Sequence, residues 1–485
     1  MIRNLEPKGL WNHFADLNAV PRPSKKEERV IQFMMDFGKS LGLETIKDAI
    51  GNVIIKKKAS AGMEDRKTII MQSHLDMVHQ KNSDTVFDFE TQGIEMIVDG
   101  DWVCANGTTL GADNGIGVAT IMAILASSDI AHPAIETMFT IDEETGMTGA
   151  MELDPSNFDG EILLNLDTED DDELSIGCAG GIDSNTSLKY VEVDLLSDAA
   201  CFQVKISGLM GGHSGMDIDK GRGNANKLMN RLLSKLMVIK GFQLISVDGG
   251  SLRNAIPRES VAVFAINHKF EGMLEVEFGE MALLLKTEFA SIEKALAFKL
   301  SPAHSSSKAV SPTDLTKIIN SIYAVHNGVF RMSPDIEGLV ETSSSLARVI
   351  VENGAFITQS LQRSSVESTK DDVADSVRAA FEAVGCDVVQ SGDYPGWQPN
   401  KDSEILKILN ELYISKFKEE PKVKACHAGL ECGILLQHLP EVDMISFGPN
   451  IRAPHSPDEK VQISSVQKFW DYLLEVLALI PKKSA

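Results

Sequence analysis

The sequence predicts an α/β protein with a mostly parallel central sheet, interrupted by an inserted α+β domain of two similar halves. Three observations support this fold class. Short apolar runs alternate with amphipathic stretches over residues 1–188, the same alternation returns over residues 397–485, and residues 189–396 instead show strands with a period of two. The first texture is typical of parallel sheets covered by helices, and the second of antiparallel strands with one solvated face.

Four apolar runs in the first segment are the predicted strands of the parallel sheet, and a helix is expected near residues 116–127. A further apolar run at 442–447 lies between helices expected at about 402–417 and 463–479. Each run is short and is bounded by turn residues, as buried strands are. One domain is therefore expected to be split in the sequence. The four runs are NVIIK (52–56), KTIIMQS (67–73), IETMFTI (135–141) and EILLNL (161–166).

The inserted region is expected to hold two strand hairpins flanked by helices, one in residues 189–300 and one in residues 301–396. The first hairpin is expected to turn around Asp248-Gly249-Gly250 and the second around Asn353-Gly354, a dipeptide that favours two-residue hairpin turns. The expected strands are CFQVKIS, SVAVFAI, LARVIVEN and AFITQSL, and the expected helices lie at about 222–238, 272–296, 312–325 and 368–384.

The charge balance argues against a polyanionic partner. The chain has 485 residues, with 46 Lys and Arg against 70 Asp and Glu, a formal net charge of −24. Such a surface repels nucleic acid and anionic membranes. The longest apolar run, residues 116–126, is too short to span a bilayer, and the N-terminus lacks the apolar core of a signal peptide. Six cysteines without a C-x-x-C pair suit a reducing compartment, so a cytoplasmic location is expected.

Polar side chains that can bind metal follow the predicted strands or precede the helix near residue 116, where open α/β sheets place their ligands. Taken singly, each of these residues would more often be a helix cap, a turn residue or a surface group. Their recurrence at five strand or helix termini instead predicts one shared site. The residues are His74, Asp76, Asp113, Glu143, Glu144, Asp167 and His455.

Two His and three acids are too many for one four-coordinate ion with an open position, so two divalent ions are expected. Imidazole and carboxylate together suit Zn²⁺ first, with Co²⁺ or Mn²⁺ as alternatives. The two ions would share a bridging carboxylate and a water whose pKa falls toward ~7. The H-x-D spacing lets Asp76 orient His74, and the adjacent acids divide into Glu144 as ligand and Glu143 as general base.

The ordered motifs of the chain resemble the aminoacylase and carboxypeptidase superfamily of co-catalytic zinc peptidases. These motifs are SHLDMV (73–78), GTTLGADNGIG (107–117), IDEETGMTGA (141–150), NLDTED (165–170), GLMGGHSG (208–215) and GPNIRAPHSPDE (448–459). Further stretches are more narrowly similar to the bacterial aminoacyl-histidine dipeptidases, also called peptidase D and carnosinase-like. Those stretches are CAGGIDS, GRGNANKL, SLRNAIPRE, YPGWQP and CHAGLECG.

The resemblance implies a role for each matching residue. His74, Asp113 (bridging), Glu144, Asp167 and His455 would be the metal ligands, Glu143 the base, and Asp76 the support of His74. It adds His213 from an inserted lid domain, to stabilise the oxyanion. Asn254 and Arg363 match substrate-binding positions, and the planar guanidinium of Arg363 suits the terminal carboxylate of a substrate.

The predicted function is therefore metal-dependent hydrolysis of small dipeptides, Xaa-His and carnosine-like substrates included, by a metal-bridging water that Glu143 activates. An N-acyl amino acid deacylase or desuccinylase on the same site is one alternative. A metal-binding scaffold without catalysis is another, although the intact Glu143 and His213 argue against it. A homodimer is compatible with the resemblance.

Overall fold

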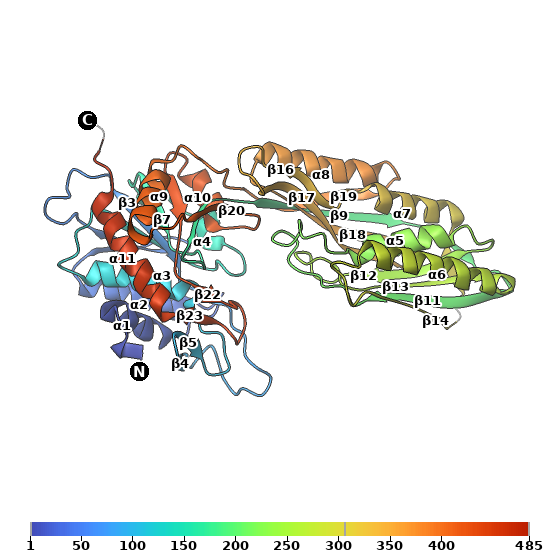
Figure 1. Ribbon diagram of the computed structural model, residues 1–485, viewed down its shortest axis with the longest axis horizontal. Coiled ribbons are helices and arrows are strands. Elements are labelled where there is room, and N and C mark those ends of the chain that lie inside the picture. Colours follow the sequence, from blue (N-terminus) through green and yellow to red (C-terminus); the bar gives the residue numbers. More distant parts are fainter. Residues whose placement is uncertain (1, 305–306, 484–485) are drawn as a thin grey trace. The chain divides into compact units, whose positions relative to one another are not determined.

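The computed structural model describes residues 2–304 and 307–483, which fold into two compact units. Each unit has its own sheet and helices (Figure 1). The predicted boundary at residue 188 falls inside β9 (Gly180–Lys189), which the structure assigns to the second unit because it pairs with strands of that unit. Unit 1 consists of residues 1–177, 397–425 and 430–485, and unit 2 of residues 178–396 and 426–429.

Unit 1 is built on an eight-stranded sheet whose four central strands run parallel, in the order β6-β3-β7-β21. The predicted mostly parallel sheet is thus confirmed, and each predicted apolar run forms a strand. All residues of β3, β6 and β7 are buried, which explains their continuous apolar character. The strands, in sheet order, are β1 (Glu44–Lys47), β2 (Val53–Lys57), β6 (Ile135–Thr140), β3 (Ile69–His74), β7 (Ile162–Asn165), β21 (Asp443–Ser446), β8 (Glu173–Cys178) and β20 (Lys422–Cys426).

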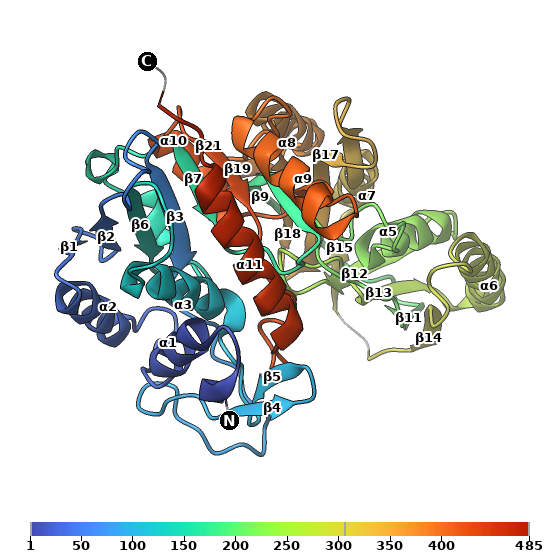
Figure 2. The ribbon, with the colours of Figure 1, turned by 60° about the vertical axis from the view of Figure 1, so that its left-hand side comes forward.

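Helices cover this sheet, and α3 (Ala112–Ala126) packs directly against β3. Figure 2 shows α3 and α11 (Ile463–Leu479) in front of the sheet. Nearly every residue of α3 is buried, so its lack of a polar face follows from its central position. The sequence prediction missed α1, α2 and α10. The other helices of unit 1 are η1 (Ile2–Asn4), α1 (Lys8–Asn18), α2 (Glu28–Ser40), α4 (Thr148–Met151), η2 (Pro155–Asn157), α9 (Glu404–Phe417) and α10 (Glu431–His438).

A small four-stranded sheet joins the C-terminal part of unit 1 to the segment before α3. Strand β23 pairs with β5, so the turn after β22 is held close to the start of α3. His455 lies in that turn, at a positive φ of 60°. The strands, in sheet order, are β22 (Ile451–Arg452), β23 (Lys460–Gln462), β5 (Trp102–Ala105) and β4 (Met96–Asp99).

Unit 2 contains a nine-stranded antiparallel sheet with helices packed against it (Figure 1). Strand β16 (Gly328–Met332) pairs with β17, and β10 (Glu192–Asp194) forms a separate pair with β15 (Lys308–Val310). The helices are α5 (Ala225–Leu236), η3 (His268–Phe270), α6 (Glu271–Glu288), α7 (Pro312–Ala324) and α8 (Glu367–Glu382). The other strands, in sheet order, are β14 (Ala297–Pro302), β11 (Ala199–Ser207), β13 (Ser260–Asn267), β12 (Gln243–Gly249), β17 (Val340–Glu352), β18 (Ala355–Ser364), β9 and β19 (Asp387–Tyr394).

One of the two predicted hairpin turns is confirmed. Asn353 and Gly354 join β17 to β18 with φ values of 50° and 77°, as a two-residue turn with positive φ at both positions requires. The other predicted hairpin is present as the antiparallel pair of β12 and β13, in which Gly249 pairs with Ser260. Its connection begins at the predicted glycines but extends over residues 250–259. That the unit consists of two similar halves stays a prediction. Within the described residues, no helix has the length and apolarity to cross a membrane.

Candidate metal and catalytic site

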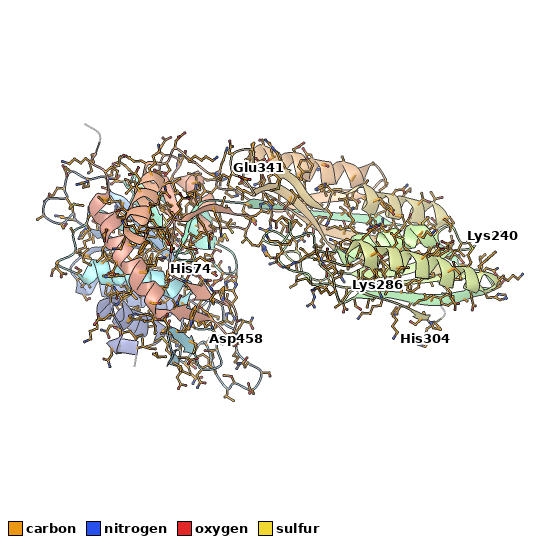
Figure 3. All side chains as sticks on the ribbon, in the orientation of Figure 1. His74, Lys240, Lys286, His304, Glu341 and Asp458 are labelled. Atoms are coloured by element: carbon orange, nitrogen blue, oxygen red, sulfur yellow. The ribbon has the colours of Figure 1, made fainter. Side chains whose placement is uncertain are left out.

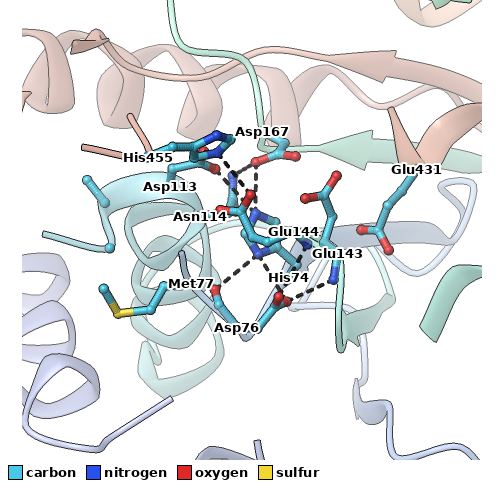
Figure 4. Close-up of polar contacts among 12 residues, drawn as sticks. His74, Asp76, Met77, Asp113, Asn114, Glu143, Glu144, Asp167, Glu431 and His455 are labelled. Carbon is cyan, nitrogen blue, oxygen red and sulfur yellow. Dashed lines mark hydrogen bonds and ion pairs between the residues drawn. The ribbon is translucent and has the colours of Figure 1, made fainter. Parts of the chain in front are cut away.

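His74 is the last residue of β3, and only 1% of its surface is exposed. Figure 3 shows it deep inside unit 1. Its Nδ1 lies 3.2 Å from the carbonyl oxygen of Asp76 and 3.4 Å from Oδ1 of the same residue. Its Nε2 lies 3.3 Å from Oδ1 of Asp113 and 3.5 Å from Oδ1 of Asp167 (Figure 4). One ring nitrogen is therefore held by Asp76 while the other faces two carboxylates.

His455 approaches the same carboxylates from the C-terminal part of the chain. Its Nε2 lies 3.2 Å from Oδ2 of Asp113 and 2.9 Å from Oε2 of Glu144. Asp113 therefore has one oxygen facing His74 and the other facing His455 (Figure 4). A carboxylate between two imidazoles is the arrangement that a bridging ligand needs.

Asp113 is positioned by Glu459, a buried residue whose role the sequence prediction missed. The two carboxylate oxygens of Glu459 accept hydrogen bonds from the four consecutive backbone N–H groups of residues 110–113, at 2.7 to 3.2 Å. These are the amides at the start of α3, which otherwise have no partner within the helix. Glu459 lies four residues after His455 in the motif GPNIRAPHSPDE. This spacing is the sequence feature that could have pointed to a role for Glu459 in the site.

Arg22 is a second missed residue, and only 1% of its surface is exposed. Its Nη1 donates to the carbonyl oxygens of Leu75 and Asp76 at 3.0 Å, and its Nη2 donates to the carbonyl oxygen of Gly111 at 2.5 Å. The guanidinium thus ties the segment after β3 to the loop before α3. Burial lowers the pKa of Arg22 to about 10, and the surrounding carboxylates oppose this shift.

Asp76 orients the acids that follow β6. Its Oδ1 accepts the backbone N–H of Glu143 at 3.0 Å, and its Oδ2 accepts the backbone N–H of Glu144 at 3.3 Å and the hydroxyl of Ser24 at 2.8 Å. The two glutamate side chains stay out of these bonds. Oε1 of Glu144 is buried without a hydrogen-bond partner among the described residues.

The carboxylates of this cluster carry negative charge that the protein compensates only partly. Burial raises the pKa of Glu143 well above its usual value, and the charges of Asp167, Glu431 and Glu144 raise it further while His74 lowers it. Burial also raises the pKa of Asp167 to about 6 and that of Glu431 to about 8. Hydrogen bonds to Asp113 and Glu144 raise the pKa of His455 to about 11. A cation bound here would relieve the repulsion.

The donor set fits divalent metal ions. Ligand atoms of His74, Asp113 and Glu144 all lie within 4.8 Å of one another. Imidazole with carboxylate is a set that Zn²⁺, Mn²⁺ and Co²⁺ accept. A second group of three acids includes Asp76 and Asp142, but Lys25 already forms an ion pair with Asp142 and Asp76 accepts the bonds described above.

Asp167 follows β7, and its contact with Nε2 of His74 makes it part of the same cluster. The side-chain amide of Asn114 donates to Oδ1 of Asp167 and to the carbonyl oxygen of Leu166, the latter at 2.8 Å. The structure therefore brings all seven predicted residues of unit 1 together in one place.

The other three predicted residues, His213, Asn254 and Arg363, lie in unit 2. The carbonyl oxygen of Asn254 accepts the backbone N–H of Ser214 at 2.8 Å, which holds the loop of His213 beside that of Asn254. Burial lowers the pKa of His213 to about 4, and the nearby charge of Arg363 lowers it further. Arg363 is only 5% exposed, and its Nη1 donates to the hydroxyl of Tyr394 at 2.9 Å.

The chain matches known proteins over nearly its full length. The sequence model of peptidase family M20/M25/M40 matches residues 70–479. The chain belongs to this family. It is 40% identical over 482 residues to the cytosol non-specific dipeptidase of Escherichia coli K12, with 99% of each chain covered. The crystal structure of aminoacylhistidine dipeptidase from Vibrio alginolyticus has a TM-score of 0.93 and 42% identity, and covers 100% of this chain and 99% of that one.

Membership of the M20/M25/M40 family confirms the predicted class, a metallopeptidase and therefore a hydrolase. The aminopeptidase PepT of Bacillus cereus has a TM-score of 0.56, covers 98% of both chains and is 14% identical, so that likeness concerns the fold alone. The family is one of di-metal enzymes, whereas the identity of the ions and the role of each site residue stay predictions.

Proposed function

We propose that this protein is a dipeptidase that hydrolyses small dipeptides, Xaa-His dipeptides among them. It would use two divalent metal ions, for which Zn²⁺ is the first candidate. The observation that carries the proposal is the convergence of His74, Asp113, Glu144, Asp167 and His455 on one point in unit 1, with Glu143 beside them. Two relatives that match the full length of the chain, at 40% and 42% identity, are themselves called dipeptidases.

His74 and Asp167 would hold one ion, Glu144 and His455 the other, and Asp113 both, because its two oxygens face the two imidazoles. When bound, the ions would polarise the scissile carbonyl and lower the pKa of water toward ~7. Oε1 of Glu144, buried without a hydrogen-bond partner among the described residues, supports a ligand role for this carboxylate.

Glu143 would act as general base. Its backbone N–H is fixed by Asp76, while its side chain has no hydrogen bond among those found in the described residues. Burial and the neighbouring acids raise its pKa, so its carboxylate accepts a proton from water more readily than an ordinary glutamate and can return it to the leaving amine. Glu143 is thus suited to both proton transfers of peptide hydrolysis.

Asp76 would hold the general base, Glu143, and the metal ligand Glu144 in position. It binds the backbone of Glu143 and Glu144 and also faces Nδ1 of His74, so one carboxylate orients three groups of the site. His213 as the oxyanion donor, with Asn254 and Arg363 as substrate-binding residues, belongs to the same proposal. So do a cytoplasmic location and a homodimer.

The test is hydrolysis of a substrate panel by the purified protein loaded with Zn²⁺, Co²⁺ or Mn²⁺. The panel pairs β-alanyl-histidine and glycyl-histidine with N-acetyl and N-succinyl amino acids. Release of histidine from the dipeptides, absent in Glu143→Gln, supports the proposal. Faster cleavage of the N-acyl substrates would instead assign the protein as a deacylase.

A further inference from the structure

Arg363 of unit 2 is a buried cation without an anionic partner. Its Nε is buried and makes no hydrogen bond, and no described carboxylate forms a salt bridge with its guanidinium. Burial raises the pKa of Asp183 while the charges of Arg253 and Arg363 lower it, but its carboxylate forms its ion pair with Nε of Arg253, at 3.1 Å. A buried charge without a partner is costly, so this guanidinium favours an anion from outside the chain.

The neighbours of Arg363 form a row across the sheet. On β17, Ser343 pairs directly with Arg363 of β18; on β9, Gly181 pairs with Arg363; and on β19, Tyr394 pairs with Gly181. Residues paired in this way have side chains on the same face of the sheet. Gly181 has no side chain, and the ring of Tyr394 fills the space where a Cβ would lie, 2.7 Å away.

His427 reaches this row from outside the sheet. Its Nε2 lies 2.7 Å from Oγ of Ser343, the cross-strand partner of Arg363. The imidazole is only 6% exposed, and no hydrogen bond to its Nδ1 is found within residues 2–304 and 307–483. Burial, together with the charges of Arg363 and His213, lowers the pKa of His427 to about 3, against the opposing charge of Asp219. His427 is therefore neutral, with one ring nitrogen engaged.

The loop of His213 is fitted against both residues. A Cβ at Gly215 would lie 2.0 Å from the carbonyl oxygen of His427 and 3.0 Å from Cδ of Arg363, so only glycine allows this approach. The segment of His427 is itself fixed, because the backbone N–H of Ala179 donates to the carbonyl oxygens of residues 426 and 428 at 2.9 and 3.0 Å. The cluster is thus held by backbone from three parts of unit 2.

We propose that His427 is a substrate-binding residue that, together with Arg363, binds the C-terminal carboxylate of the dipeptide. The hydroxyl of Ser343 donates to Nε2, which places the proton of the neutral ring on Nδ1, and Nδ1–H donates to one carboxylate oxygen. Arg363 binds the carboxylate through the N–H groups that Tyr394 leaves open. The inference rests on the proposed dipeptidase function and adds a second determinant for a free C-terminus.

The experiment compares glycyl-histidine with glycyl-histidine amide in wild type, His427→Ala, His427→Gln and Ser343→Ala. In His427→Ala we expect KM for the free acid to rise about 10- to 100-fold, the effect of losing one hydrogen bond to a charged group, with kcat changed far less. KM for the amide should stay near its wild-type value. His427→Gln keeps a donor and should restore part of the affinity, whereas Ser343→Ala should show a smaller rise because only the ring orientation is lost.

His132→Ala is the matched control, since His132 is an equally buried imidazole of unit 1 that bonds to a backbone carbonyl. It should leave the ratio of acid to amide KM unchanged. If His427→Ala prefers the acid as strongly as wild type does, the inference is wrong while the dipeptidase function stands. If wild type cleaves no dipeptide, the proposed function fails. Thermal stabilisation by the free dipeptide, compared with that by its amide, then tests His427 independently of activity. The difference between acid and amide should decrease most in His427→Ala and less in Ser343→Ala.

Discussion

The two units present opposite electrostatic problems. In unit 1, Asp113, Glu144 and Asp167 lie close together with little exposure, and burial with the charges of the other two acids raises the pKa of Asp167 to about 6, so the cluster attracts cations. In unit 2, Arg363 is buried beside two imidazoles, His213 and His427, and has no anion among the described residues. Under the proposed function, divalent ions would provide the cations for unit 1, and the terminal carboxylate of a substrate would provide the anion for Arg363 of unit 2. Each prediction below tests one side of this contrast.

The largest expected effect is that of Glu143→Gln. The amide cannot accept the proton, so kcat should fall by ~10²–10⁴, the range typical of a general base. Because Glu143 is predicted to be a base and not a ligand, both ions should remain in elemental analysis after gel filtration. Glu152→Gln, an exposed control in the same unit, should keep full activity. Wild-type kcat in Glu143→Gln with full metal content would remove Glu143 from the mechanism.

Asp113→Ala should lower the metal content of the protein, whereas Glu143→Gln should lower kcat with the metal content unchanged. Without the carboxylate that lies between His74 and His455, the two ions would repel each other unscreened, and about one ion or more per chain should be lost. Asp129→Ala, an exposed substitution, should retain the full complement. Two ions still bound to Asp113→Ala would contradict a bridging role.

Arg363→Ala tests the anion side of the contrast. In wild type, amidation of the substrate's carboxylate should lower kcat/KM by ~10- to 100-fold, because a charge-assisted hydrogen bond contributes ~1.5–3 kcal/mol. In Arg363→Ala this penalty should decrease, since the guanidinium that recognises the charge is gone, while the part that depends on His427 should remain. A mutant that discriminates acid from amide as strongly as wild type does would show that Arg363 does not bind the carboxylate.

Patterns with local causes could be predicted from the sequence. The strands of unit 1 are continuous apolar runs because both faces are buried, and α11 begins and ends at the predicted residues 463 and 479. The Asn353-Gly354 turn follows from the conformational freedom of two adjacent residues. That the residues proposed as metal ligands lie close together was predictable because strand ends gather at one edge of a parallel sheet.

The misses have non-local causes. Gly250 has a positive φ of 78°, and a Cβ there would lie 1.8 Å from the carbonyl oxygen of Ala347, so a close backbone approach requires this glycine, and the connection to β13 runs on to residue 259. The predicted helix to residue 296 ends at Glu288 because the chain must reach β14, which pairs with β11. Glu459 is defined as a positioning residue only by its contacts with residues 110–113, far away in the sequence.

The smallest expected effect concerns the stability of unit 2 as the pH falls. The pKa of His427 is about 3 in the folded protein, against about 6.5 for an unperturbed histidine. Below pH 6.5 the unfolded chain binds a proton that folded His427 does not, so the free energy of unfolding decreases as the pH falls from 6.5 toward 3. One such group contributes a slope of ~1.4 kcal/mol per pH unit. His427→Gln has no proton to bind and should lose this contribution to the slope, while His213 still titrates in both proteins.

Urea unfolding followed by circular dichroism between pH 6.5 and 5, in a buffer free of carboxylates, measures the difference between wild type and His427→Gln. Parallel pH dependences for wild type and His427→Gln would mean that folded His427 takes up its proton at the same pH as the unfolded chain, and would contradict the lowered pKa that keeps the imidazole neutral.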